Sequence, residues 1–404
     1  MGVHLGYGAM EPHAILGDLL KRQNHGKADL ALSTNFALAA CSLADAPLSA
    51  GRLSTCSKAL RHAMVKAMQE LQRERLYVVG GLDSSFAALA TVERYDPLEG
   101  SWETLLPLPT ARHGTCLAAF ASHLYVIGGE VSGVALRDVQ RFCPRGAQTW
   151  EMMPALAVGR IKAAAAECQG CLYVMGGNDG FGSVSSVECF DPLAGCWKDV
   201  APMQKPRYAS CAAARDDCII VFGGELTEAG AAASVEVYDA QVNTWHLLPT
   251  LRSPLCGSVA VLTEAGDQVY CFGGLGLSGQ ALTFAERAVL GYEDQQGTAC
   301  KPSWSPLPPM LTARQQMSAC TFEDGLVIVG GKGITSEAQA KVEYYSQSSG
   351  WQALPPLPSA RLRSAVIAGG ARCPVRGVRR VFSGVSFFWS WAQRNGGSAC
   401  WCSL

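Results

Sequence analysis

Six pairs of adjacent glycines recur along this chain at a nearly constant interval, and each pair is followed by a tryptophan. The steps between successive pairs are 48, 48, 47, 50 and 57 residues. The pairs are Gly80-Gly81, Gly128-Gly129, Gly176-Gly177, Gly223-Gly224, Gly273-Gly274 and Gly330-Gly331, and the tryptophans are Trp102, Trp150, Trp197, Trp245, Trp304 and Trp351. A period near fifty residues predicts a repeat architecture, in which similar units stack on one another.

Each unit contains the same succession of short segments. An apolar run rich in β-branched and aromatic residues, such as residues 76–79, precedes the glycines and is too short for a helix. A second run, such as residues 92–95, alternates apolar and polar side chains, as in a strand with one wet face. In two units Asp-Pro then turns the chain, and in each unit the tryptophan opens a further strand. The units therefore predict several short strands each.

An arginine follows the tryptophan after a turn rich in leucine and proline. Five of these arginines lie ten residues after their tryptophan: Arg112, Arg160, Arg207, Arg314 and Arg361. Arg252 lies seven residues after Trp245, so this unit departs from the pattern.

Paired glycines, a downstream aromatic residue, the tryptophan and the arginine together resemble the kelch repeat. The resemblance covers roughly residues 72–370 and implies an all-β fold, a six-bladed β-propeller with four-stranded antiparallel blades around a channel. The packing of sheets supports this fold, because one unit cannot bury both faces of its own sheet and must stack against its neighbours. The last blade must also be fastened to the first. We predict that residues 364–368 form the inner strand of the first blade; the competing segment is residues 60–64.

The two ends of the chain do not carry the repeat. We expect residues 1–71 to form a short, partly helical segment. Within it, residues 32–61 loosely resemble an F-box, a helical module that docks a ubiquitin-ligase core. The alternative is an ordinary amphipathic helical lead-in. Residues 371–404 contain five arginines and no lysine or acidic residue, which predicts an irregular or disordered tail; a mis-predicted gene end is the alternative.

Composition narrows the classes of partner. The net charge of −1 gives no electrostatic argument for binding nucleic acid or an anionic membrane, and no stretch has the length of a membrane span. The seventeen cysteines are odd in number, and Cys168 and Cys171 lack a second pair at zinc-ligand spacing. Reduced thiols indicate an intracellular protein. We therefore expect a cytoplasmic location, with the nucleus as the alternative.

Enzymatic chemistry is not expected. Galactose oxidase, a kelch-like relative, binds copper through two histidines and two tyrosines. Here His113, His123 and His246 occupy three different repeat positions, so convergence on one metal is not expected. The sequence therefore predicts no metal, no cofactor and no catalytic residues, and a small-molecule enzyme that uses the channel is the least favoured alternative.

The resemblance implies a binding role instead. In kelch propellers that read peptides, arginines at the motif position crowd the mouth of the channel, where guanidinium groups suit acidic or phosphorylated segments. The matching residues are Arg112, Arg160, Arg207, Arg252, Arg314 and Arg361. The alternative is that some of them pair with carboxylates at blade edges. An insertion in the fifth unit, residues 275–300, is a further candidate contact loop. The predicted function is a protein-interaction module, with a ubiquitin-ligase substrate receptor as the alternative.

Overall fold

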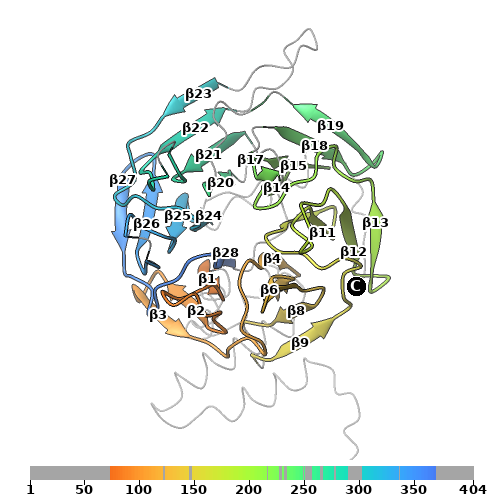
Figure 1. The fold of residues 1–404 in the computed structure, drawn as a ribbon, viewed down its shortest axis with the longest axis horizontal. Coiled ribbons are helices and arrows are strands. Elements are labelled where there is room, and N and C mark those ends of the chain that lie inside the picture. The colour runs from red at the N-terminus through yellow and green to blue at the C-terminus, as the bar shows by residue number, and fades with distance from the viewer. Residues whose placement is uncertain are drawn as a thin grey trace, which may run out of the picture. The chain divides into compact units, whose positions relative to one another are not determined.

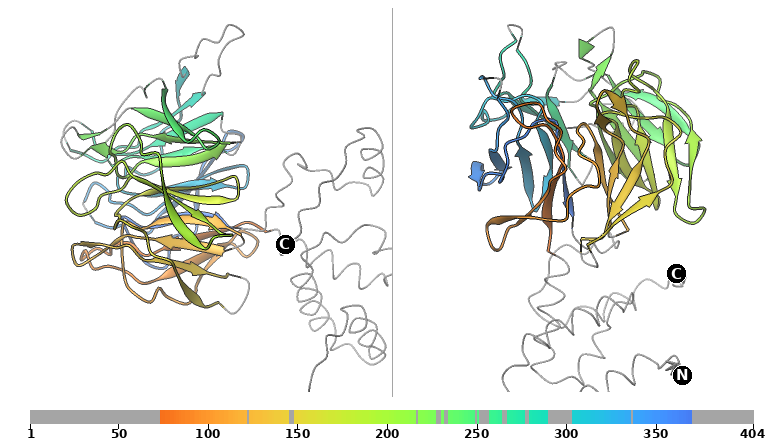
Figure 2. Two further views of the ribbon diagram at one scale, coloured as in Figure 1. Left: turned by 90° about the vertical axis from the view of Figure 1, so that its right-hand side faces the viewer. Right: turned by 60° about the horizontal axis from the view of Figure 1, so that its bottom comes forward.

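Six four-stranded antiparallel sheets form a ring in the computed structural model (Figures 1 and 2). The structure describes residues 73–369, apart from 122, 145–147, 216, 227–229, 232–233, 249, 251–256, 264–266, 277–278, 290–302 and 336. The predicted all-β, six-bladed propeller is confirmed.

Each blade runs from an inner strand at the channel to an outer strand at the rim, and blade 1 is the sheet β28-β1-β2-β3. The inner strands of blades 1 to 6 are β28 (Ala365–Gly369), β4 (Cys116–Phe120), β10 (Ala164–Cys168), β14 (Cys211–Arg215), β20 (Val259–Leu262) and β24 (Ser318–Phe322). The second strands are β1 (Arg75–Val79), β5 (His123–Ile127), β11 (Cys171–Met175), β15 (Cys218–Phe222), β21 (Gln268–Phe272) and β25 (Gly325–Val329).

The third and outer strands complete the same order. The third strands are β2 (Val92–Asp96), β8 (Val139–Phe142), β12 (Val187–Asp191), β18 (Val235–Asp239), β22 (Ala285–Val289) and β26 (Val342–Ser346). The outer strands are β3 (Ser101–Thr104), β9 (Trp150–Met153), β13 (Cys196–Val200), β19 (Thr244–Leu248), β23 (Ser303–Pro306) and β27 (Gly350–Leu354). Two small hairpins, β6 (Glu130–Val131) with β7 (Val134–Ala135) and β16 (Glu225–Leu226) with β17 (Gly230–Ala231), extend from blades 2 and 4.

The core lies between neighbouring blades. The second strands are apolar on both faces, and the last four residues of each are buried. Six apolar clusters occupy the six blade interfaces, so that Ile127 of blade 2, for example, shares a cluster with Val174 of blade 3. A strand buried on both faces needs a continuous apolar run, which explains the lack of alternation before the glycines.

The tryptophans join adjacent blades. The Trp197 indole N–H donates to the carbonyl of Pro154 in the preceding blade at 2.8 Å, and Trp351 donates to Pro308 at 2.7 Å. Trp102, Trp150 and Trp245 make the equivalent bond, and Trp304 packs in the cluster between blades 4 and 5. The indole ring buries a large apolar surface between two blades, and its N–H group can still donate a hydrogen bond to the neighbouring blade.

The glycine pairs end the second strands where two blades meet. Gly176 has a φ of +61°, and a Cβ there would lie 2.4 Å from the carbonyl oxygen of Arg207 in the next blade. The N–H of Gly177 donates to that same carbonyl at 2.8 Å. Only glycine combines this conformation with so close an approach of two backbones.

The ring is closed by the C-terminal side of the propeller. β28 pairs antiparallel with β1, with Leu76 opposite Ala368 and Val79 opposite Ala365. The predicted inner strand at residues 364–368 is therefore confirmed to within one residue. The competing segment, residues 60–64, lies outside the described residues, and β28 occupies the place it would have needed.

Other predictions for the chain ends fall outside the described residues. These are the helical, F-box-like segment at residues 1–71 and the tail at residues 371–404. In the described part of the chain no helix is long and apolar enough to cross a membrane. The extra length of the fifth unit falls between β22 and β23, at residues 290–302, which are also outside the described residues.

Candidate interaction site at the channel mouth

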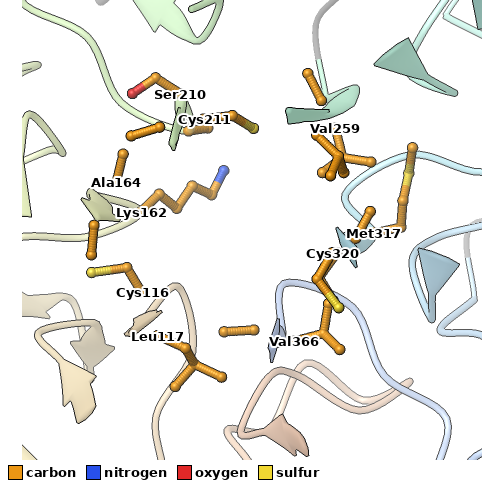
Figure 3. A pocket seen from close by; sticks show the side chains of 18 of the residues that line it. Cys116, Leu117, Lys162, Ala164, Ser210, Cys211, Val259, Met317, Cys320 and Val366 are labelled. Atoms are coloured by element: carbon orange, nitrogen blue, oxygen red, sulfur yellow. The ribbon is translucent and has the colours of Figure 1, made fainter. Parts of the chain in front are cut away.

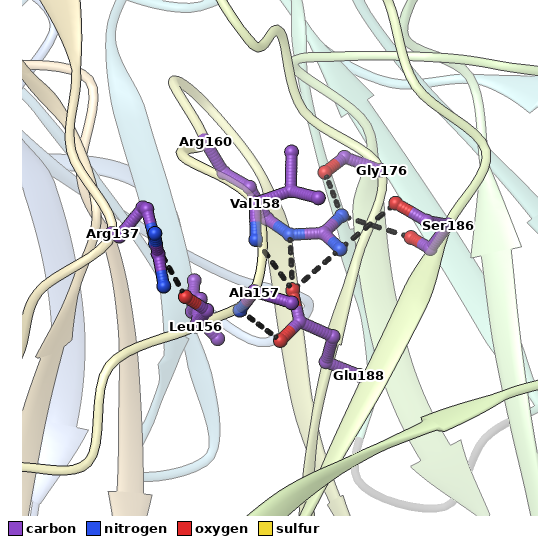
Figure 4. Close-up of polar contacts among 8 residues, drawn as sticks. All are labelled: Arg137, Leu156, Ala157, Val158, Arg160, Gly176, Ser186 and Glu188. Carbon is purple, nitrogen blue, oxygen red and sulfur yellow. Dashed lines mark hydrogen bonds and ion pairs between the residues drawn. The ribbon is translucent and has the colours of Figure 1, made fainter.

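The motif arginines are buried inside the blades. The Arg160 guanidinium donates to the carbonyls of Gly176 and Ser186 at 2.7 and 2.8 Å, and it forms an ion pair with Glu188 at 2.9 Å (Figure 4). Glu188 also accepts a hydrogen bond from the Ala157 N–H at 2.7 Å. The arginine is 1% exposed and its carboxylate partner is equally buried. Both charges are therefore satisfied within the protein, as burial demands.

The same ion pair recurs around the ring. Arg207 pairs with Glu236 at 2.6 Å, Arg361 with Glu93 at 2.5 Å, and Arg314 with Glu343. Blade 2 has Gln140 at the position of the glutamate, and Arg112 pairs instead with Asp138 at 2.7 Å. Burial is the main cause that lowers the pKa of Arg207, Arg314 and Arg361, and their glutamate partners oppose it.

The predicted position of these residues therefore needs correction. Arg112, Arg160, Arg207, Arg314 and Arg361 do not crowd the channel mouth, because all five are at most 1% exposed. Arg252 lies outside the described residues. The alternative from the sequence was that some of them pair with carboxylates at blade edges. All five pair with carboxylates, and four of these partners are glutamates buried inside the blades. Their contribution to partner binding stays a prediction, and their geometry favours a structural role.

The channel mouth is formed by residues two positions further along the chain. A chain of backbone hydrogen bonds links successive blades there: Gly114 donates to Arg363, Lys162 to Gly114, Ala209 to Lys162, Gln316 to Gly257, and Arg363 to Gln316, at 2.6–3.1 Å. These residues, together called the mouth ring, all have φ between 51° and 65°. For the four that are not glycine this conformation is uncommon, and the interlocked bonds hold it.

Two side chains of the mouth ring are cationic, and the carboxylate of Glu225 also lines the channel. Lys162 reaches toward the channel in Figure 3, and its Nζ lies 5.5 Å from the centre of the Tyr208 ring. The Arg363 Nε donates to the Gln316 side chain at 3.0 Å. Gly114 stands between Lys162 and Arg363 in the ring and has no side chain. Two cationic side chains therefore stand on either side of Gly114, against which the Ile161 side chain packs.

His113 lies beside this position. Its Nε2 is 3.7 Å from a carboxylate oxygen of Glu130, and its buried Nδ1 has no hydrogen-bond partner. Burial lowers the pKa of His113; Glu130 opposes this effect, and Arg363 and Lys162 add to it. Burial and the two nearby cations therefore both favour the neutral form of this histidine.

Below the mouth, small side chains line a cavity of about 390 Å³. Alanines of β10 and β14, Val259 and Val366 contribute to its wall (Figure 3). Cys116 also faces it, and burial raises the pKa of this thiol to about 12. Such a thiol is unreactive, as expected for a cysteine that serves as a small apolar side chain.

No metal centre is found among the described residues, where no three histidine, cysteine, aspartate or glutamate side chains are grouped to hold an ion. His123 contacts the carbonyl of Ala121 in a turn, and His246 contacts Thr244 on an outer strand, so neither lies near His113 in the repeat. Cys168 and Cys171 face each other across the β10–β11 turn and form no disulfide bond.

Sequence reasoning missed two features of this region. The second residue of the third strand is glutamate in five blades, and this period matches that of the arginines; it was the signal for the buried ion pairs. The mouth ring has no such signal, because its side chains differ from blade to blade.

The fold and its repeated ion pair define a class of protein, the β-propellers with a glycine-arginine repeat. A model described as the KLHDC2/KLHL20/DRC7 Kelch-repeats domain matches residues 54–224, and a Kelch motif model matches residues 206–252. The chain therefore contains kelch repeats within a six-bladed β-propeller. The first match begins inside the segment that resembles an F-box.

Curated relatives agree over short stretches. The chain is 43% identical over 86 residues to Kelch-like protein 35 of Mus musculus, covering 21% of this chain and 14% of that protein. It is 37% identical over 70 residues to Alpha-scruin of Limulus polyphemus, covering 17% of this chain and 8% of that protein. The matched part is thus a small fraction of each relative's length.

A solved structure shares the fold. The structure titled "Structure of YjhT" aligns with a TM-score of 0.54 at 15% identity, and the alignment covers 69% of this chain and 96% of that one. At this identity the likeness concerns the fold alone.

Proposed function

We propose that this propeller is a protein-interaction module that binds an acidic or phosphorylated segment of a partner protein at the channel mouth. The observation that supports it is the pair of cations, Lys162 and Arg363, on either side of Gly114 in the mouth ring. Positioned cations bind carboxylates and phosphates through charge-assisted hydrogen bonds. These residues take the role that the sequence suggested for the buried arginines.

Charge reversal at the mouth tests this proposal. The full chain and its Lys162→Glu/Arg363→Glu variant are used to capture proteins from the source cell, and captured proteins are quantified by mass spectrometry. Proteins that bind the mouth should be depleted by the double variant. Lys198→Glu is the control, because this lysine lies on the outer strand β13 and is exposed. If the double variant and the control capture the same proteins equally, the mouth is not the binding site.

A second candidate is that the module serves as a substrate receptor of a ubiquitin ligase. It is favoured by the F-box-like stretch at residues 32–61. Co-purification with ligase core subunits, lost on deletion of residues 1–71 and retained in the mouth variant, would support it. If those subunits are absent from the captured proteins, the ligase-receptor proposal is wrong and only the interaction-module proposal stands.

We also propose that the chain is not an enzyme and works in the cytoplasm. The described cysteines form no disulfide bonds, which supports a reducing compartment. Metal analysis of the purified protein and microscopy of a tagged chain test the two statements. A stoichiometric transition metal, or a location in the secretory pathway, would contradict them.

A further inference from the structure

Two rigid loops on the mouth face each present one exposed phenylalanine. Phe86 lies between β1 and β2 and is 57% exposed; Phe181 lies between β11 and β12 and is 97% exposed. These loops occupy the same place in blades 1 and 3. They begin next to the mouth ring, because bridges join Leu82 to Leu362 and Asn178 to Ile161.

The Phe86 loop is built around a carboxylate. The Asp83 side chain accepts hydrogen bonds from the N–H groups of Ser85 and Ala87 at 2.8 and 2.9 Å and from the Ser85 hydroxyl at 2.7 Å. Phe86 itself has a φ of 61°, which is rare for a bulky residue, and Lys332 Nζ lies 5.8 Å from its ring centre. The loop backbone that carries Phe86 is therefore held by the Asp83 carboxylate, at a cost in backbone strain.

The Phe181 loop uses the same device with different residues. Asp179 accepts hydrogen bonds from the N–H groups of Phe181 and Gly182, both at 2.9 Å, and Asn178 accepts one from Gly180 at 2.8 Å. Rigid, exposed aromatic side chains are the residues that most often dominate binding energy at protein interfaces, since little entropy is lost when they bind.

Blades 1 and 3 thus repeat one arrangement. Each presents a cation at the mouth ring, Arg363 or Lys162, and an exposed aromatic further out, Phe86 or Phe181. Blade 2, between them, contributes Gly114, which has no side chain, and Val134, which is 61% exposed. The sector of blades 1 to 3 is therefore cationic at its centre and apolar on both sides.

We infer that this sector binds a peptide segment with a central acidic group flanked on both sides by aromatic or aliphatic side chains. The inference rests on the proposed function and adds the two apolar contacts. Carboxylates or a phosphate would lie between Lys162 and Arg363, and the flanking apolar side chains would pack on Phe86 and Phe181. The carboxylates of Asp83 and Asp179 remain charged, and backbone N–H groups of their own loops bind them.

The probe is a peptide selected from a random display library on the full wild-type chain. Selected peptides should combine Asp or Glu with flanking Leu, Phe or Trp. Their affinity is measured by fluorescence anisotropy, and Phe86→Ser/Phe181→Ser should lower it by about tenfold or more. The matched control is Leu98→Ser/Leu193→Ser, since Leu98 and Leu193 are 70% and 87% exposed in blades 1 and 3 but lie at the opposite ends of the strands.

The outcomes separate this inference from the proposed function. If Lys162→Glu/Arg363→Glu abolishes peptide binding while the phenylalanine variant binds as tightly as wild type, the inference is wrong and the proposed function stands. If no peptide is selected, or the selected peptides bind the charge-reversed chain equally well, both are wrong. An unchanged thermal midpoint for each variant shows that the fold is intact.

Discussion

A buried arginine of the repeat connects two blades. The carbonyl of Arg160 accepts a hydrogen bond from the Gly129 N–H of blade 2 at 2.8 Å, while its guanidinium binds two carbonyls and Glu188 of blade 3. An unpaired charge is very costly in a protein interior, so each partner depends on the other. The side chain therefore contributes to the stability of the ring before any partner is considered.

Loss of this arginine should destabilise the propeller. We expect Arg160→Ala to lower the free energy of unfolding by about 3–5 kcal/mol, because Glu188 is left buried without its cation. Urea unfolding followed by tryptophan fluorescence measures the change. Arg160→Met combined with Glu188→Leu should recover part of it. An Arg160→Ala chain of wild-type stability that binds its partner poorly would instead restore the binding role suggested by the sequence.

The stability of the protein should also depend on His113. Burial holds its pKa below the ordinary value of 6.5, so the unfolded chain takes up a proton at a higher pH than the folded one. The contribution of neutral His113 to the free energy of unfolding is fully present above about pH 6.5 and decreases as the pH falls below that value. We expect His113→Gln to show a smaller loss of unfolding free energy between about pH 7.5 and 5.5. Parallel pH profiles for the two chains would contradict the assignment.

At the scale of elements, the glycine pair decides how closely two blades approach. Gly176 and Gly195 have nearly the same φ, +61° and +64°, but a Cβ on Gly195 meets open space and one on Gly176 meets a backbone carbonyl. The two positions therefore separate the cost of the left-handed conformation from the cost of the contact between blades.

Alanine at these two glycines should give different losses of stability. Gly195→Ala should cost about 1–2 kcal/mol from the backbone conformation alone. Gly176→Ala should cost a further 1–3 kcal/mol or so, since the carbonyl of Arg207 must shift. Thermal unfolding of both variants measures the difference. Equal losses would mean that the interface between blades 3 and 4 yields easily.

The strands and their order could be predicted because the same strand-forming runs recur in every repeat unit. The run 76–79 and the run 92–95 became β1 and β2 almost without change, and the apolar character of the first follows from burial on both faces. The site was less predictable. A buried arginine and an exposed one look alike in a sequence unless the matching glutamate, such as Glu188, is counted with it. Lys162 and Phe181 lie at positions where the residue type differs from blade to blade, so the repeat pattern does not indicate their role.

At the scale of the whole molecule, the ring depends on its last strand. Truncation after Pro358 removes both Arg361 and β28 and leaves β1 without an inner neighbour and Glu93 without its cation. We expect this chain to be unfolded or aggregated, as judged by circular dichroism and size-exclusion chromatography. Truncation after Gly370 keeps both groups and should leave the thermal midpoint of the propeller unchanged. A folded product of the first truncation would show that closure is dispensable.

The closing strand also imposes a delay on synthesis. Glu93 and Arg361 are 268 residues apart, and β28 follows them. At about 5–20 residues per second, a ribosome needs roughly ten seconds to a minute to make the intervening chain. Throughout this interval the first blade has an open edge at β1, of the kind that recruits other strands. We therefore expect the nascent chain to need protection by chaperones for longer than a protein whose blades close in the order in which they are made.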